Sequence, residues 1–348
     1  MLQVSLLFWQ LLSNMLLSWG FMINPCDQCV ANKQINGKQC TIIWHMDNLK
    51  ISHMSENVVE YIIWWLNELF GKESPLTTSR GKVLEYLGLT LDYSTQGKVK
   101  ISMYEYVWKI VEEAPEDMKG VTKTPVGSHL FVTNPDCDKL PEKTVKIFHH
   151  IAVKLLYLCR RTWQDIQTAV AFLCTRVKSP DSYDYRKLTR VIQYLRGTQD
   201  LTLMIEPGDH LNWWVDSSYA IHPDMCSHSG IIMMLGKGVM YSFSCKQKLN
   251  TKSSTEAELV VIDDAMVQVL WMQHFLAAQV EYIPMATIYQ DNKSTILLAE
   301  NGRASSSNQM RHLNVRYYFI TDQIKKGHMK VAICPMQEMI ADLFTKPL

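Results

Sequence analysis

The sequence predicts an α+β protein that ends in an α/β unit, a mixed β-sheet with helices packed on it. Two observations predict this class. Short apolar strands mix with helical patterns before residue 125 and again after residue 206, whereas residues 144–198 show helical spacing alone. In addition, 348 residues with 47% hydrophobic content can bury more than one core, which excludes a disordered chain. We therefore predict three parts, 1–125, 126–205 and 206–348.

The first element is an apolar helix at the start of the chain. Its large apolar residues recur at three- and four-residue spacing, which favours a core helix. A signal peptide or a membrane segment is the alternative interpretation. It is less favoured because no Lys or Arg precedes the run, polar residues interrupt it, and no small-residue cleavage site follows it. The recurring residues are Leu6, Leu7, Trp9, Leu12, Leu16 and Trp19.

Strand and helix patterns then mix until residue 125. Apolar runs of strand length are followed by turn residues, and one longer stretch has helical spacing. The expected elements are a strand and turn at 40–48, a helix at 55–70, and strands at 84–94 and 98–103.

The second part opens with an irregular stretch and continues with helices. Residues 122–143 carry prolines at 125, 135 and 141 and show little periodicity, so we predict a linker. Three helices without evident chemistry follow, and Gly197 is a plausible end for the last of them. They are expected at 145–161, 165–177 and 184–197.

The third part has an informative order of elements. Three strands come first, the second and third joined by a Gly-Lys-Gly hairpin signal, and a long helix then starts at a Ser/Thr cap. A strand, helices, another strand and a closing helix complete the order, which predicts a mixed sheet flanked by helices. The strands are expected at 210–220, 227–235, 238–247, 285–292 and 328–335.

Four carboxylates of the third part stand out by position. Asp216 ends the first strand, Glu258 lies in the first turns of the long helix, Asp291 ends the fourth strand, and Asp342 lies on the last helix. Oxygen ligands of this kind suit Mg²⁺. Two such ions about 3.5–4 Å apart can hydrolyse a phosphodiester. Each acid alone is more typical of a solvated surface charge, and Glu256 could be a capping residue of the same helix.

The motifs around these acids resemble the ribonuclease H domain that closes the polyprotein of copia-type LTR retrotransposons. They occur in the family's order over about 140 residues, and the last of them matches letter for letter. The motifs are "WVDSSYA", "KSSTEAEL", "QDNKST", "RHLNVRYYFI" and "ADLFTKPL".

The resemblance implies a ribonuclease H-like fold and a two-metal site. Asp216, Glu258, Asp291 and Asp342 would bind two Mg²⁺ ions, with Mn²⁺ as an alternative, and the partner would be an RNA–DNA hybrid whose RNA strand is cut. Glu258 is preferred to Glu256 because the family's catalytic Glu precedes an aliphatic residue and a helical run.

His312 matches a His of the family and is a candidate for proton transfer, with an ordinary helix-face residue as the alternative. Three nearby positions depart from the family's usual letters. Asn314 stands where Asp is common, Tyr318 where His is common, and Cys226 where a basic residue is usual.

The upstream sequence is similar to the palm of the reverse transcriptase in the same polyproteins. There a hairpin turn carries two adjacent aspartates; here Asp47 keeps the first position and Asn48 replaces the second. The resemblance begins at Met1 in the middle of the palm, so we expect its first half to be missing. We interpret 1–125 as a truncated palm with Asp47 as a relic metal ligand, 126–205 as linker and thumb or connection, and 206–348 as ribonuclease H.

These interpretations predict a ribonuclease without DNA polymerase activity. The alternative is a catalytically inactive retroelement remnant with at most residual nucleic-acid binding. Lys+Arg (35) and Asp+Glu (34) nearly cancel, so charge neither supports nor excludes a nucleic-acid partner.

Cysteine content bears on the compartment. Nine Cys are scattered, and the one CxxC motif, at Cys26 and Cys29, lacks a second pair at zinc-site spacing. Free thiols fit a reducing compartment. We expect an intracellular protein, cytoplasmic or nuclear, without a membrane partner, and the sequence leaves the oligomeric state open.

Overall fold

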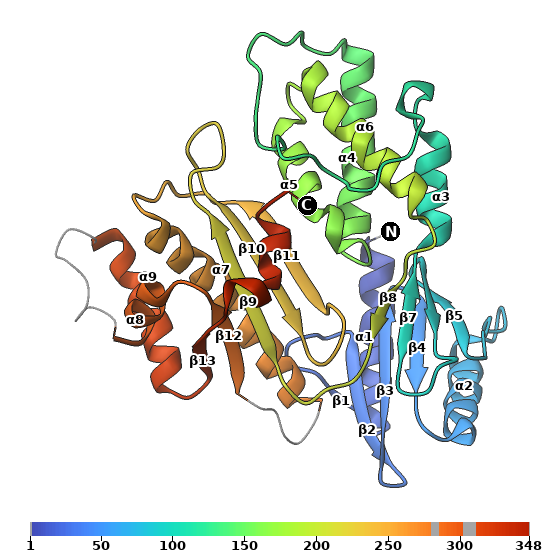
Figure 1. Ribbon diagram of the computed structural model, residues 1–348. Helices are drawn as coiled ribbons and strands as arrows, with labels where there is room; N and C mark the ends of the chain where they lie inside the picture. The colour runs from blue at the N-terminus through green and yellow to red at the C-terminus, as the bar shows by residue number, and fades with distance from the viewer. Residues whose placement is uncertain (1, 280–284, 302–310, 348) are drawn as a thin grey trace. The chain divides into compact units, whose positions relative to one another are not determined.

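The computed structural model describes residues 2–279, 285–301 and 311–347, without the side chains of 2–4 and 311–317 (Figure 1). The chain forms two compact units. Unit 1 contains Met1–Leu91 with Leu270–Ile283, and unit 2 contains Asp92–Val269 with Pro284–Leu348. Compactness alone does not test the three functional parts expected from the sequence, which stay a prediction.

Unit 1 is built on an antiparallel sheet in the order β1-β2-β3-β4. Alternate residues of β3, including Ile42 and Trp44, are buried with Ile62 of α2, as period-2 alternation on a half-covered sheet requires. The elements are α1 Leu2–Ser18, β1 Met22–Ile23, β2 Val30–Ile35, β3 Lys38–His45, β4 Asn48–Ser52, α2 Glu56–Phe70, β5 Val83–Tyr86 and β6 Leu89–Asp92, the last ending at the first residue of unit 2.

The predicted helix at the start of the chain is confirmed as α1, although its buried stripe is shorter than predicted. Leu12 and Leu16 are fully buried in the core of unit 1. Leu6 and Leu7, in contrast, are 55% and 59% exposed, while Phe8 and Trp9 are partly buried against the same core.

The stretch around Asp47 is an ordinary hairpin. Residues His45 and Asn48 pair across it, and Met46 takes a positive φ of 52° in the two-residue turn. Asp47 is exposed, and its Oδ1 accepts a bond of 3.3 Å from the Asn48 amide. The predicted strand and turn are confirmed, and the turn needs no metal for its shape.

The first half of unit 2 is mainly helical. The three helices expected after residue 144 are confirmed, and a further helix, α3, buries Val107, Ile110 and Val111 at i, i+3 and i+4 spacing. Strands β7 and β8 pair antiparallel. The elements are β7 Val99–Ser102, α3 Tyr104–Glu113, η1 Glu116–Met118, α4 Glu142–Cys159, η2 Gln164–Ile166, α5 Gln167–Arg176, α6 Ser182–Gly197 and β8 Leu203–Ile205.

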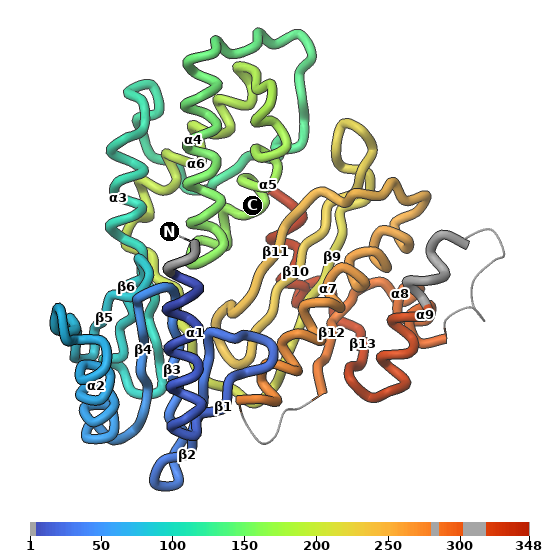
Figure 2. The backbone as a smooth tube through the Cα atoms, turned by 180° about the vertical axis from the view of Figure 1, so that it is seen from behind, coloured from blue at the N-terminus to red at the C-terminus, as the bar shows by residue number. Residues whose placement is uncertain are grey.

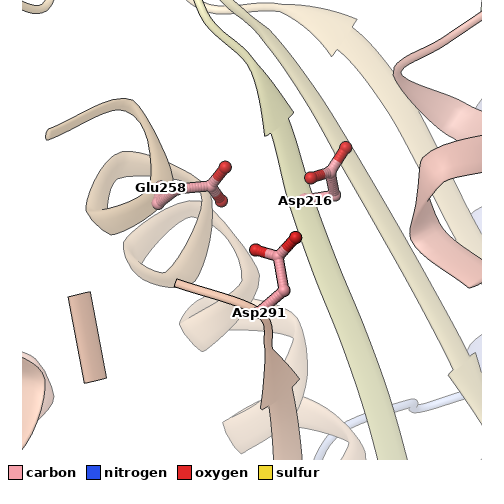
Figure 3. A group of neighbouring side chains, drawn as sticks. All are labelled: Asp216, Glu258 and Asp291. Atoms are coloured by element: carbon pink, nitrogen blue, oxygen red, sulfur yellow. The ribbon is translucent and has the colours of Figure 1, made fainter. Parts of the chain in front are cut away.

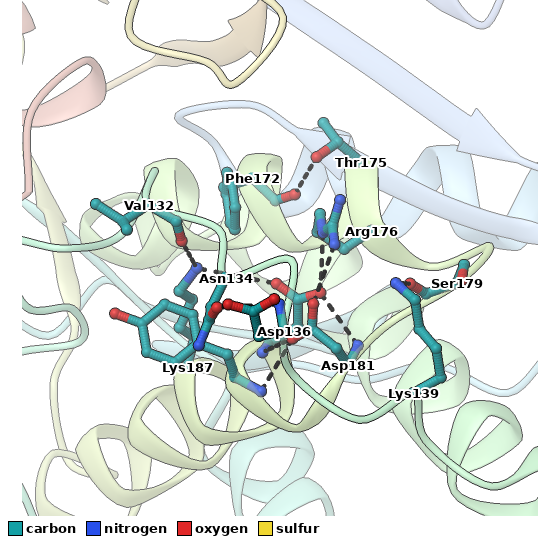
Figure 4. Close-up of polar contacts among 12 residues, drawn as sticks. Val132, Asn134, Asp136, Lys139, Phe172, Thr175, Arg176, Ser179, Asp181 and Lys187 are labelled. Atoms are coloured by element: carbon teal, nitrogen blue, oxygen red, sulfur yellow. Dashed lines mark hydrogen bonds and ion pairs between the residues drawn. The ribbon is translucent and has the colours of Figure 1, made fainter.

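The predicted linker is irregular, as expected, but it is not a loose connection. Leu130 and Phe131 are buried in unit 2. Figure 4 shows the Lys187 ammonium of α6 donating to the Val132 carbonyl at 2.6 Å, which ties the stretch to the helix. The α6 N-terminus is fixed in turn by a capping box around Asp181. Leu130 and Phe131 do not belong to a run with helical or strand spacing, so the sequence pattern could not predict that they are buried.

The second half of unit 2 contains the mixed sheet expected from the sequence. Its order is β11-β10-β9-β12-β13, with β9, β10 and β11 antiparallel and β12 parallel to both β9 and β13. Figures 1 and 2 show α7 running across one face of this sheet. The elements are β9 Asn212–Ser218, β10 His228–Met234, β11 Tyr241–Lys246, α7 Ser254–Ala277, β12 Ala286–Gln290, α8 Lys293–Asn301, α9 Arg311–Lys325, β13 Met329–Ile333, η4 Met336–Glu338 and η5 Ile340–Phe344.

The closing segment differs from the predicted helix, because it forms the short 3₁₀ helices η4 and η5. Phe344 and Ala341 of η5 pack with Ile232 of β10 in a small core cluster. Within the described residues, α7 is the one helix long and apolar enough to cross a membrane, by length and composition only. Its first turns bury Leu259 and Val261, as in a core helix.

Candidate metal centre

Two of the predicted acids come from neighbouring parallel strands. Asp216 lies inside β9, opposite Gly230 of β10, and is 3% exposed. The expectation that Asp216 ends its strand is therefore wrong, because β9 continues to Ser218. Asp291 directly follows β12, whose residue Tyr289 pairs with Trp214 of β9. Continuing this parallel register by two residues puts Asp291 beside Asp216.

The third carboxylate reaches this place from α7. Glu258 is 5% exposed, its Oε1 accepts the Ser217 backbone N–H at 3.2 Å, and its Oε2 accepts the Gln290 amide at 3.0 Å. Figure 3 shows Asp216, Glu258 and Asp291 turned toward one another, and one oxygen of each lies within 4.8 Å of the others. In the part of the chain that the structure describes, no other group of three His, Cys, Asp or Glu residues is close enough to share a metal ion.

Glu256, the alternative to Glu258, has a different role. Its Oε2 accepts the Lys252 N–H at 2.7 Å, and its own N–H donates to Ser253 Oγ at 3.2 Å. These contacts satisfy backbone groups at the start of α7, which is what a capping residue does. The two glutamates are two residues apart and therefore point to different sides of the helix.

Asp342 lies nearby on η5 but outside the group of three. Its Oδ1 is 2.7 Å from Lys346 Nζ, and the same ammonium is 3.9 Å from Asp216 Oδ2. Thr345 Oγ1 also donates to Asp216 Oδ2. Sequence reasoning missed Thr345 and Lys346, although their i+3 and i+4 spacing from Asp342 was a usable signal.

Burial shapes the electrostatics of the cluster. It raises the pKa of Glu258 to about 8, and the charge of Asp216 adds to this effect. Burial likewise raises the pKa of Asp216 to about 6, with Thr345 and Lys346 opposing the rise. The pKa of Asp291 is raised, again mainly by burial. Two buried carboxylates and the half-buried Asp291, each with a raised pKa, fit a hard divalent cation that supplies the missing counter-charge.

Among the described side chains, the remaining sequence candidates make none of these contacts. His312 and Asn314 belong to α9, but their side chains are outside the described residues. Tyr318 is exposed on the same helix. Cys226 is buried, and its Sγ is 2.7 Å from Asn250 Oδ1. Asp47 belongs to unit 1 and to no described group of three metal-ligating side chains.

Comparison with known proteins places this geometry in context. No family model matches the chain. A Pol polyprotein from the Arabidopsis thaliana transposon RE2 is 28% identical over 269 residues, which are 76% of this chain and 18% of that protein. One from the Nicotiana tabacum transposon TNT 1-94 is 24% identical over 332 residues, 92% of this chain and 24% of that protein. This chain is similar to retrotransposon Pol polyproteins.

The extent of the likeness differs between relatives. The chain spans about a fifth of the length of the Pol polyproteins it matches. A putative transposon Ty5-1 protein of Saccharomyces cerevisiae is 24% identical, and the match covers 77% of this chain and 86% of that protein. The expected resemblance to copia-type polyproteins is thereby confirmed.

Solved structures match in part. A compost-derived LC11 ribonuclease H1 is 11% identical with a TM-score of 0.28, and the match covers 37% of this chain and 86% of that one. The prototype foamy virus protease-reverse transcriptase is 13% identical with a TM-score of 0.31, and the match covers 88% of this chain and 36% of that one.

Proposed function

We propose that the chain is a metal-dependent ribonuclease that cuts the RNA strand of RNA–DNA hybrids. The observation that carries the proposal is the convergence of Asp216, Glu258 and Asp291, one oxygen of each lying within 4.8 Å of the others, from three different elements of the sheet unit. The substrate class is what the ribonuclease H resemblance implies, and the similarity to Pol polyproteins supports it.

Each residue has a defined part in this proposal. Asp216 would be the ligand shared by both ions, Glu258 is held in place by the Ser217 N–H and the Gln290 amide, and Asp291 completes the group. Asp342 adds a fourth carboxylate on the side of Lys346. Two Mg²⁺ ions, or Mn²⁺ in their place, would activate a water and stabilise the leaving oxygen. His312 stays a proposed proton-transfer residue.

The direct test is cleavage of an end-labelled RNA–DNA hybrid by the full chain in Mg²⁺ or in EDTA. We expect metal-dependent cutting of the RNA strand alone, lost in Asp216→Asn because the shared ligand is neutralised. A folded wild-type protein that leaves the hybrid intact in Mg²⁺ would instead support the alternative, an inactive remnant of a retroelement.

We also propose that residues 1–125 correspond to a palm segment, 126–205 to linker and thumb or connection, and 206–348 to ribonuclease H. The hairpin turn offers one exposed acid, Asp47, beside the neutral Asn48. One carboxylate is a poor ligand set for two cations that must each be neutralised.

No template-directed DNA extension is therefore expected from the 348-residue chain, and Asn48→Asp should not restore it. The measurement is primer extension on an RNA template with all four deoxynucleotides and Mg²⁺, beside a known reverse transcriptase as positive control. Extension above background by either the wild type or Asn48→Asp would overturn the proposal.

A further inference from the structure

Lys346, close to the end of the described chain, places a positive charge beside the acidic cluster. Lys346 Nζ lies 2.7 Å from Asp342 Oδ1 and 3.9 Å from Asp216 Oδ2. Its side chain is 49% exposed, so the ammonium reaches the cluster from the solvent side. In the described residues, no ion pair joins a Lys or Arg to Glu258 or Asp291. The described ion pairs of Lys346 at the cluster are therefore those with Asp216 and Asp342.

Packing of the backbone fixes this position. Thr345 is fully buried, its carbonyl accepts the Ser218 hydroxyl at 3.0 Å, and its own hydroxyl donates to Asp216. The Ser244 hydroxyl holds the Phe344 carbonyl at 2.7 Å. Hydrogen bonds to the Phe344 and Thr345 carbonyls therefore fix the backbone that carries Lys346.

Gly230 makes this close approach possible. It is the residue paired with Asp216, and a Cβ added there would lie 2.7 Å from Thr345 Cγ2 and 2.9 Å from the Ala341 carbonyl oxygen. Any side chain at this strand position would push the closing segment away from the sheet. Gly230 therefore allows the segment that carries Thr345 and Lys346 to pack beside the acids.

We infer that the Lys346 ammonium occupies the place of a cation shared by Asp216 and Asp342, and that divalent-metal binding there must displace it. The inference rests on the proposed metal site. Asp216 accepts a hydrogen bond from Thr345 and pairs with Lys346, whereas Glu258 accepts hydrogen bonds from the Ser217 N–H and the Gln290 amide. A metal ion held by Asp216 and Asp342 would have to compete with Lys346 and would therefore bind more weakly than one held by Glu258.

The Lys346 ammonium also affects the stability of the protein without metal. The Lys346 ammonium is 2.7 Å from Asp342 Oδ1 and 3.9 Å from Asp216 Oδ2, so its charge is attracted to both carboxylates. An ammonium that partly neutralises these acids stabilises the folded protein until metal arrives. Removing it should weaken the metal-free protein and strengthen metal binding at the same time.

Lys346→Met tests this. The full chain is titrated with MgCl₂ at constant ionic strength, with binding followed by calorimetry and by the rise in melting temperature, because a ligand that binds only the folded state stabilises it. We expect the weaker half-saturation concentration to fall roughly two- to fivefold, the size expected for losing one half-exposed ion pair. Lys346→Arg keeps the charge and should titrate like the wild type.

Lys326→Met is the matched control. Lys326, the residue after α9, forms the same kind of i,i+4 pair, with its Nζ 2.7 Å from Asp322 Oδ2. Its loss should leave the Mg²⁺ titration unchanged. Equal half-saturation for Lys346→Met and wild type would overturn the inference while leaving the ribonuclease proposal intact. A wild type with no Mg²⁺ response, matched by Asp216→Asn, would overturn both.

Discussion

Glu258→Gln is expected to reduce metal-dependent cleavage on the order of 10³-fold and, without metal, to make the protein more stable at pH 8. The first effect follows because a charged metal ligand is lost. The second follows because burial raises the pKa of Glu258 to about 8. The folded protein keeps a proton that the unfolded chain releases near the ordinary value of 4.5, so stability is present below 4.5 and lost as pH rises toward 8.

The gain can be bounded. Each pH unit between 4.5 and 8 weakens the wild-type folding equilibrium up to tenfold through this group. Glutamine removes that loss but forfeits one of the two hydrogen bonds that Glu258 accepts, worth about 1 kcal/mol. We expect a net gain of at most about 4 kcal/mol at pH 8 and none at pH 5, measured by urea unfolding in EDTA.

Glu256→Gln is the control for both effects. Glu256 is equally buried and two residues away, but its carboxylate caps α7. It should lose about 1 kcal/mol or less, as for a weakened cap, and keep full cleavage. Opposite behaviour, with Glu256→Gln inactive and Glu258→Gln active, would mean that the wrong glutamate has been assigned to the metal.

The position of the carboxylate group was largely predictable from the sequence. Asp216 and Asp291 each close or nearly close an apolar strand, and parallel neighbours bring such residues to one edge. The choice between Glu256 and Glu258 was harder because both lie in the first turns of one helix. It depends on Ser217 and Gln290, which are tertiary contacts without a local pattern.

The closing segment and the supposed linker show where pattern reasoning fails. A closing helix was expected, but η5 is a 3₁₀ turn pressed against Gly230, and this packing brings Lys346 to the acids. The 122–143 stretch lacks periodicity yet buries Leu130 and Phe131. In both cases side chains distant in sequence decide the outcome, and hydrophobic spacing records only local structure.

A pair of buried histidines predicts acid sensitivity. His222 Nε2 is 2.9 Å from His228 Nδ1, and His228 Nε2 is 2.7 Å from Ser244 Oγ. Phe131 packs on both rings, with centroids 5.1 and 5.2 Å away. Burial lowers the pKa of His222 to about 4, assisted by Lys246, and that of His228 to about 3, assisted by His222.

The stability that depends on His222 and His228 changes with pH in the opposite direction to the stability that depends on Asp216 and Glu258. The unfolded chain binds protons on both histidines near pH 6.5, whereas the folded protein resists until about pH 4 and pH 3. Stability from this pair is therefore complete above pH 6.5 and is lost as pH falls. Between about pH 4.5 and 6, Asp216 and Glu258 change stability in the other direction, so without metal the two pairs offset each other.

Saturating Mg²⁺ should reveal the histidine effect, because bound metal keeps the acids ionised in the folded protein. We expect the urea midpoint to be nearly constant from pH 4.5 to 6 in EDTA, and to fall steeply with decreasing pH in Mg²⁺. His222→Phe, placed beside Phe131 and Phe172, should reduce the Mg²⁺ slope by about one proton, and exposed His210→Gln should not. If the urea midpoint fell equally steeply in EDTA and in Mg²⁺, the prediction would be refuted. Such a result would mean that Asp216 and Glu258 do not offset the two histidines in the absence of metal.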